Sequence, residues 1–302
     1  MEAKTFYSFI IAISLILFIS IYWFIPLNRI EFNLSPNSNF SLNNSENSTL
    51  QFYSSMRFPE ESISYKIEGC SLKRLNDMEE AFDLVEKETI LDFYPVEYGQ
   101  EITITCEDTI EIEGNLFTAG EGGPTNVTII DGFNIIESGK ILLLRDSTCE
   151  RPNIAIHELL HVLGFTHSEN RQNIMYKISE CDQTMGDDLI DFINEIYAIP
   201  NQPDLLFENA SVVMRGKYLD INFSIRNNGL RYSEESILRI MVDGKEVEEM
   251  KISPIEMGEG IRGYMKNILI KQISINNIDF IIDSNFEELN KLNNEISFEI
   301  KK

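Results

Sequence analysis

The sequence predicts an α+β domain with three helices, followed by an all-β sandwich and preceded by a transmembrane helix. Three observations support this prediction. Residues 6–24 are almost wholly apolar, residues 62–200 mix strand alternation with helical spacing, and residues after 203 show strand alternation only. Strands mixed with helices indicate an α+β domain, and six or seven short strands in about a hundred residues indicate a sandwich.

The apolar run predicts a membrane anchor. No residue from 5 to 28 is charged, and about 20 apolar residues span a bilayer as a helix. The run exceeds the ~7–15 apolar residues of a cleavable signal peptide, and no clear small-residue cleavage site follows it. We interpret residues 1–5 as a cytoplasmic tail and residues 6–26 as an uncleaved signal anchor, with a cleaved signal peptide as the alternative.

The orientation of this anchor rests on cysteines and glycosylation sequons. Lys4 and Arg29 lie on opposite sides of the run, so the positive-inside rule does not determine which end of the helix is cytoplasmic. An even number of cysteines and several Asn-x-Ser/Thr sequons favour export of the C-terminal part. The sequons begin at Asn33, Asn39, Asn43, Asn47, Asn126, Asn209 and Asn222. We expect a single-pass cell-membrane protein with its C-terminal part outside the cytoplasm.

Charge and composition exclude some partners. The 302 residues carry 49 acidic and 25 basic side chains, a formal net charge of −24. Nucleic acids and anionic membrane surfaces bind basic footprints, so neither is an expected partner. The hydrophobic fraction of 43% is sufficient for ordinary cores, and the length suits about two domains.

Composition also suggests the domain boundaries. Residues 27–58 are rich in Asn and Ser without an apolar period, which predicts a flexible linker; an irregular part of the folded domain is the alternative. Residues 59–200 are the predicted α+β domain, and residues 204–302 the predicted sandwich.

Within residues 59–200 the periodicities predict the elements. The expected strands are 62–67, 101–106, 127–130 and 140–144, with a Gly-rich turn at 120–124. The expected helices are near 75–91, at 153–163 and around 189–196, the last capped by Thr184 and Asp187.

The most informative segment is HELLHVLGFTH, residues 157–167. His157 and His161 lie on one helix face, one turn apart, so both imidazoles can reach one metal ion. Gly164 can end the helix and turn the chain, which lets His167 return as a third ligand. Three neutral nitrogens and one water make a catalytic zinc site. Glu158 lies beside a ligand and can act as general base on the zinc-bound water.

This pattern is specific. The three histidines of the chain all lie in it, and composition alone would produce its five fixed positions in about 10⁻⁴ of such chains. The alternatives are three structural histidines or a zinc site without catalysis.

The segment resembles the metzincin signature HExxHxxGxxH, and HSENRQNIMY (residues 167–176) resembles the matrixins. The resemblance implies a mixed twisted sheet with three helices, one catalytic Zn²⁺, and a zinc endopeptidase with Glu158 as catalytic residue. It implies that Met175 is the methionine-turn residue. It also implies an extended peptide or protein substrate along an edge strand, at residues 115–119 or 127–130.

The sequence departs from the matrixin pattern at three points. Leu160 stands where the family often has a small residue, no histidines remain for a second, structural zinc, and no pro-segment cysteine motif is present. The sequence therefore does not indicate how an inactive form of the enzyme would be maintained. Calcium at Asp187 and Asp188 has weak support, because acidic residues at a helix N-terminus explain the pair.

The four cysteines predict two disulfides. We expect Cys70–Cys106 and Cys149–Cys181, one of three possible connectivities, which would hold the active-site segment against the sheet. Cysteine as a zinc ligand is the alternative.

Residues 204–302 resemble the CARDB family of surface domains, through PDLLFENASV, LDINFSIRNNG, MVDGKEV and IDSNFEELNKLNNEISFEI. The resemblance implies an immunoglobulin-like sandwich that serves as a spacer or binds a surface protein or glycan. No catalytic constellation occurs in this half.

The leading hypothesis is a membrane-anchored, extracytoplasmic zinc endopeptidase. The alternative is a surface adhesion or binding protein with a non-proteolytic metzincin domain, but such a protein needs no general base. A metallohydrolase of non-peptide amides is a third hypothesis, and the methionine turn argues against it.

Overall fold

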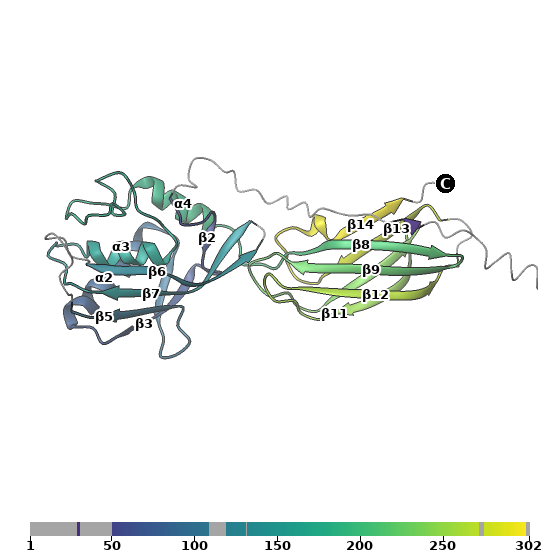
Figure 1. Ribbon diagram of the computed structural model, residues 1–302, viewed down its shortest axis with the longest axis horizontal. Coiled ribbons are helices and arrows are strands. Elements are labelled where there is room, and N and C mark those ends of the chain that lie inside the picture. The colour runs from purple at the N-terminus through teal and green to yellow at the C-terminus, as the bar shows by residue number, and fades with distance from the viewer. Residues whose placement is uncertain (1–28, 31–49, 109–118, 131, 272–274, 300–302) are drawn as a thin grey trace, which may run out of the picture. The chain divides into compact units, whose positions relative to one another are not determined.

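The computed structural model describes residues 29–30, 50–108, 119–130, 132–271 and 275–299 (Figure 1). The described residues form two compact units. One, which we call the α+β unit, holds residues 50–202 and 229–231; the other, the β unit, holds the rest. The predicted anchor at 6–26 lies outside the described residues. Among the described residues, no helix is long and apolar enough to cross a membrane.

A mixed sheet forms the framework of the α+β unit. Its order is β4-β3-β5-β7, with β2 and β6 also paired to β7. Strand β3 is parallel to β4 and β5, and β7 is parallel to β5 and β2. Strand β6 is antiparallel to β7. The strands are β2 (Met56–Arg57), β3 (Ser62–Glu68), β4 (Asp92–Pro95), β5 (Ile102–Cys106), β6 (Gly120–Ile130) and β7 (Phe133–Leu143).

Three helices complete this unit, as predicted: α2 (Leu72–Glu88), α3 (Asn153–Val162) and α4 (Asp187–Tyr197). The side chain of Ser71 caps α2 by accepting a hydrogen bond from the Arg74 N–H. Helix α3 runs alongside β6 (Figure 1). Its apolar side chains are buried in one core with the apolar stripes of α2 and α4.

The predicted cap of α4 is wrong. The N-cap is Gly186, with φ 79°, and no side chain caps the helix. Thr184 instead pairs with the methionine-bearing loop, where its N–H donates to the carbonyl of Gln172 and its carbonyl accepts from Ile174. This pairing holds Thr184 away from the helix end.

The Gly-rich turn predicted at 120–124 is also wrong, because these residues are the first half of β6. Here the strand passes over α3. A Cβ on Gly122 would lie 2.3 Å from the backbone oxygen of Glu158, and one on Gly120 would lie 2.7 Å from its Cγ. Glycine is required because the backbones approach too closely for a side chain.

The end of the predicted linker, residues 50–58, folds with the α+β unit. Met56, Arg57 and Phe58 are buried, and β2 pairs with β7. Gln51 forms an antiparallel bridge with Phe165. The prediction missed this because the contacts are with distant segments and leave no local period. Residues 50–58 are therefore part of the α+β unit.

The β unit contains two four-stranded sheets, β1-β8-β9-β12 and β11-β10-β13-β14. Both contribute to one hydrophobic core. Its strands are β1 (Arg29–Ile30), β8 (Leu205–Arg215), β9 (Tyr218–Asn227), β10 (Ser236–Val242), β11 (Lys245–Ile252), β12 (Gly260–Leu269), β13 (Asn277–Asp283) and β14 (Glu295–Glu299). The seven strands β8–β14 agree with the predicted number, and Asp243-Gly244 forms the expected hairpin turn between β10 and β11.

Candidate active site

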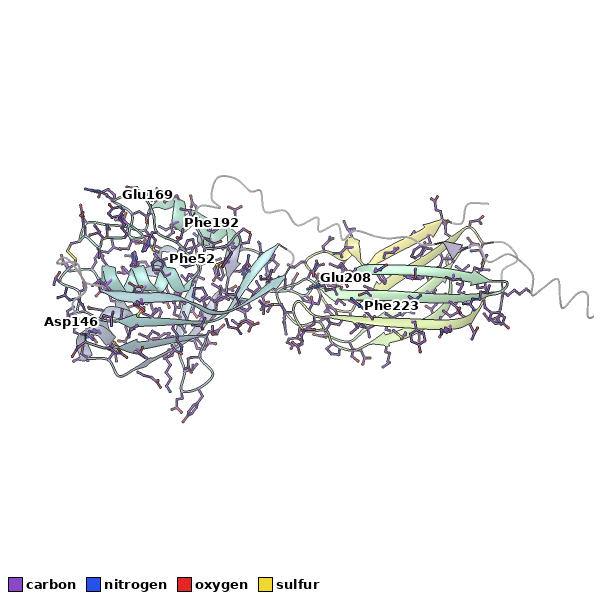
Figure 2. The ribbon with its side chains drawn as sticks, in the orientation of Figure 1. Phe52, Asp146, Glu169, Phe192, Glu208 and Phe223 are labelled. Carbon is purple, nitrogen blue, oxygen red and sulfur yellow. A yellow bond between two sulfur atoms is a disulfide. The ribbon has the colours of Figure 1, made fainter. Side chains whose placement is uncertain are left out.

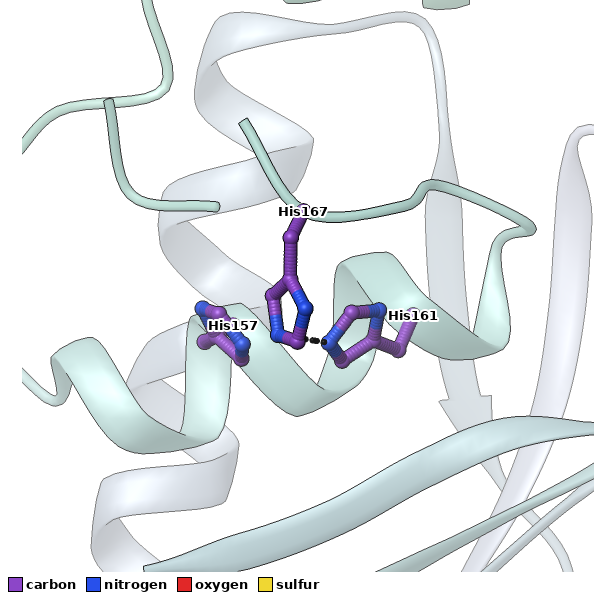
Figure 3. A group of neighbouring side chains, drawn as sticks. All are labelled: His157, His161 and His167. Carbon is purple, nitrogen blue, oxygen red and sulfur yellow. Dashed lines mark hydrogen bonds between the residues drawn. The ribbon is translucent and has the colours of Figure 1, made fainter. Parts of the chain in front are cut away.

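Helix α3 and the turn after it bring the three histidines together (Figure 3). His157 and His161 are one turn apart on the helix. Gly164 follows with φ +95°, which favours glycine, and a Cβ there would lie 2.7 Å from that of Met56. The chain therefore reverses, and His167 reaches back over the helix.

The imidazoles converge on one point. One ligand atom from each lies within 4.8 Å of the others. The Nε2 atoms of His161 and His167 are 3.2 Å apart. His157 and His161 are 9% and 7% exposed, whereas His167 is exposed. One side of the group is thus fixed in the core and the other faces solvent.

Backbone carbonyls orient the two buried rings. Nδ1 of His157 donates to the oxygen of Ile174, and Nδ1 of His161 donates to that of Phe165, both at 2.7 Å. Because a carbonyl only accepts, each Nδ1 carries the proton and each Nε2 presents its lone pair. Such partners of the second nitrogen fix the tautomer of a metal-binding histidine.

Burial also keeps these two rings neutral. Desolvation lowers the pKa of His157, and it lowers the pKa of His161 to about 4. The hydrogen bonds to Ile174 and Phe165 oppose this shift. A neutral imidazole is the form that binds a metal ion.

Met175 lies in a tight turn directly after Ile174, whose carbonyl accepts from His157. Its side chain is 1% exposed. Its N–H donates to Oδ1 of Asn173 at 2.8 Å, and its carbonyl accepts from the N–H of Ser168 at 2.8 Å. Because the carbonyl of Ile174 in this turn accepts the hydrogen bond from His157, the position of the turn affects the orientation of the first imidazole.

Glu158 is the carboxylate beside the group, and it is only 6% exposed. Desolvation raises its pKa to about 8, with a smaller contribution from the charge of Glu121; a hydrogen bond from the Gly122 backbone opposes the shift. A cation bound at the imidazoles would lower this pKa, because it would stabilise the carboxylate.

The donor set fits zinc. Two nitrogens bound at about 2.0–2.1 Å to one tetrahedral ion lie about 3.4 Å apart, close to the 3.2 Å between His161 and His167. The Nε2 lone pairs of His157 and His161 point toward the same place as the imidazole of His167. Lone pairs that face one another repel unless a cation lies between them. Three nitrogen ligands leave a fourth position free, as catalytic zinc sites do.

Two disulfides support the segments around the site. They are Cys70–Cys106 and Cys149–Cys181, the pairs expected from the sequence. The second joins the approach to α3 with the loop after Met175. Both cysteine pairs are consumed in these bonds, so none is a ligand of the histidine group.

Family comparisons agree with this geometry. The family model for Matrixin matches residues 57–198, and that for CARDB matches residues 202–298. The chain therefore carries a matrixin-like region followed by a CARDB-like region. The matrixin match supports a metalloprotease at the level of the family and implies zinc. The CARDB match marks a surface-type domain.

Two solved structures each match about a third of the chain. The CARDB domain of a Pyrococcus furiosus protein, crystallised with di-metal ions, is 17% identical, covers 33% of this chain and 87% of its own, and has a TM-score of 0.28. A cell-surface-type domain from Methanosarcina acetivorans is 20% identical, covers 32% and 88%, and has a TM-score of 0.28. No curated protein matches the chain.

Several residues around the site are not among those predicted from the sequence. The composition around Gly120 and Gly122 predicts a turn, although glycine inside a strand can also mark a close approach of two backbones. Phe52 falls in the predicted linker, yet its ring stacks on that of His161, with centroids 5.7 Å apart. The only signal there was the return of apolar residues at Leu50.

Proposed function

We propose that the matrixin domain is a zinc endopeptidase. The observation that carries this proposal is the convergence of three imidazoles beside a buried carboxylate, under the edge of a sheet. A structural site would need no such carboxylate, whereas peptide hydrolysis needs a base at this place.

Each side chain has a defined task. His157, His161 and His167 would hold the zinc ion, with the first two rings fixed by carbonyls. When bound, zinc supplies Lewis acidity that polarises a carbonyl and makes water more acidic. Glu158 takes a proton from the attacking water as the new C–O bond forms. It returns that proton to the amine nitrogen as the C–N bond breaks.

The substrate would bind as an added strand on β6. Among the described residues, β6 pairs only with β7, so its other edge can accept backbone hydrogen bonds. Its first half, at Gly120–Gly123, passes Glu158. We therefore place the scissile bond by this half rather than by residues 127–130; the other predicted edge, 115–119, is described only at Ala119.

We also propose that residues 6–26 anchor the protein and that both domains lie outside the cytoplasm. The uncharged run and the paired cysteines support this. Membrane fractionation of cells expressing the full chain, followed by protease treatment of intact cells, tests it. A chain that is released by high salt, or that is cut only after lysis, would contradict it.

Zinc content and proteolysis test the central proposal. The purified full chain should hold one zinc per molecule and cleave unfolded casein, and a chelator should stop cleavage until zinc is restored. Zinc without cleavage of any peptide would favour the adhesion alternative. A chain without bound zinc would remove the basis of the proposal.

A further inference from the structure

Residues 50–57, which we call the N-terminal clasp, lie against the turn between the second and third histidines. The N–H of Phe52 donates to the carbonyl of Gly164 at 2.9 Å. The N–H of Thr166 donates to the carbonyl of Leu50 at 2.8 Å. The clasp thus adds a short antiparallel pairing to the loop that leads to His167.

The clasp also contacts His161 directly. The ring of Phe52, which is labelled in Figure 2, stacks on the imidazole with an interplanar angle of 24°. Gln51 forms its antiparallel bridge with Phe165, and the carbonyl of Phe165 orients Nδ1 of His161. The imidazole is therefore held at its edge by Phe165 and on its face by Phe52.

Buried polar contacts fix the shape of the clasp. The Gln51 side chain is 5% exposed. Its Nε2 donates to the carbonyl of Met56 at 2.7 Å, and its Oε1 accepts from the N–H of Met56 at 2.9 Å. Met56 lies against Gly164. These bonds close residues 51–56 into a loop whose two ends both contact the turn after α3.

The far end of the clasp is anchored to α4. Arg57 is fully buried and donates to the carbonyls of Ile196 at 2.6 Å and Ile199 at 2.9 Å. Its guanidinium lies 4.6 Å from the ring centroid of Tyr197. A cation at the C-terminal carbonyls of a helix is favourable. The clasp therefore connects the end of α4 to the turn of the histidine helix.

We propose that the N-terminal clasp positions the zinc site and that Phe52 is the positioning residue for the His161 imidazole. This inference rests on the proposed function, because it assumes that His161 binds zinc. Residues that orient a metal ligand change affinity by about 10–100-fold when removed. Phe52→Ala should therefore weaken zinc binding by about 10-fold.

The test compares the full chain with three variants. Phe52→Ala removes the ring, Phe52→Tyr keeps it, and Tyr53→Ala removes the neighbouring aromatic, which is 65% exposed. Zinc affinity is measured by competition with a chromophoric chelator, and ligand geometry by the visible absorption of the cobalt-substituted proteins. Thermal unfolding of the metal-free proteins reports folding separately.

The expected result is a weaker affinity and an altered cobalt spectrum in Phe52→Ala alone, with the metal-free protein still folded. Wild-type affinity and spectrum in Phe52→Ala would overturn the clasp while leaving the protease proposal intact. The same loss in Tyr53→Ala would also overturn it, because the effect would not be specific to the stacked ring. A wild-type chain that binds no zinc would overturn both proposals.

Discussion

The Nδ1 of His157 donates a 2.7 Å hydrogen bond to the carbonyl oxygen of Ile174, the residue before Met175. The first imidazole is therefore oriented by the turn that carries the buried methionine, 17 residues away in sequence. Any change that moves this turn should move the ring as well. This relationship makes Met175 a testable part of the site, although its sulfur need not contact the metal.

Met175→Ala should destabilise the turn. The side chain is 1% exposed, and truncating a buried methionine to alanine costs about 2–5 kcal/mol of the free energy of unfolding. Met175→Leu conserves volume and should cost less than about 1.5 kcal/mol. Urea unfolding of the metal-free proteins measures both. Equal stability of the alanine variant and the wild type would show that the turn does not depend on this side chain.

The glycines of β6 offer a matched pair of substitutions. A Cβ on Gly122 would lie 2.3 Å from the Glu158 backbone, whereas one on Gly123 would have no neighbour within 4 Å. Gly122→Ala should displace β6 from α3, cost about 1–3 kcal/mol and reduce peptide cleavage at least tenfold. Gly123→Ala should retain cleavage. Casein assays and unfolding of both variants decide this, and equal behaviour of the two would refute the close approach.

Removing the Cys149–Cys181 disulfide should loosen the site. The two cysteines are 32 residues apart, and closing a loop of this size contributes about 2–4 kcal/mol. The double serine variant should therefore unfold at lower denaturant concentration and lose zinc more readily to a chelator. The corresponding variant of Cys70 and Cys106, which lie farther from Met175 along the chain, is the comparison. A larger loss of zinc in that variant would contradict the role given to Cys149–Cys181.

The sequence predicted those parts of the site that depend on local geometry. The spacing of His157, His161 and His167 around Gly164 needs only a helix and one turn, so the motif contains its own structure. The expected helices are likewise present, because their buried faces recur at helical spacing.

The features that sequence reasoning missed depend on long-range packing. Gly120 and Gly122 have the composition of a turn, and only the passage of β6 over α3 explains them. Phe52 lies more than a hundred residues before His161, and its segment pairs with a loop rather than a strand. Such pairings impose no period on the sequence, so residues 50–57 resembled the preceding linker.

The most direct test of the central claim is Glu158→Gln in the full chain. The substitution keeps the size of a buried side chain but removes its ability to take a proton. We predict one bound zinc per chain, as in the wild type, with cleavage of unfolded casein reduced by about 10²–10⁴-fold. Measured zinc together with undiminished cleavage would contradict the assignment of Glu158 as general base and the hydrolytic mechanism built on it.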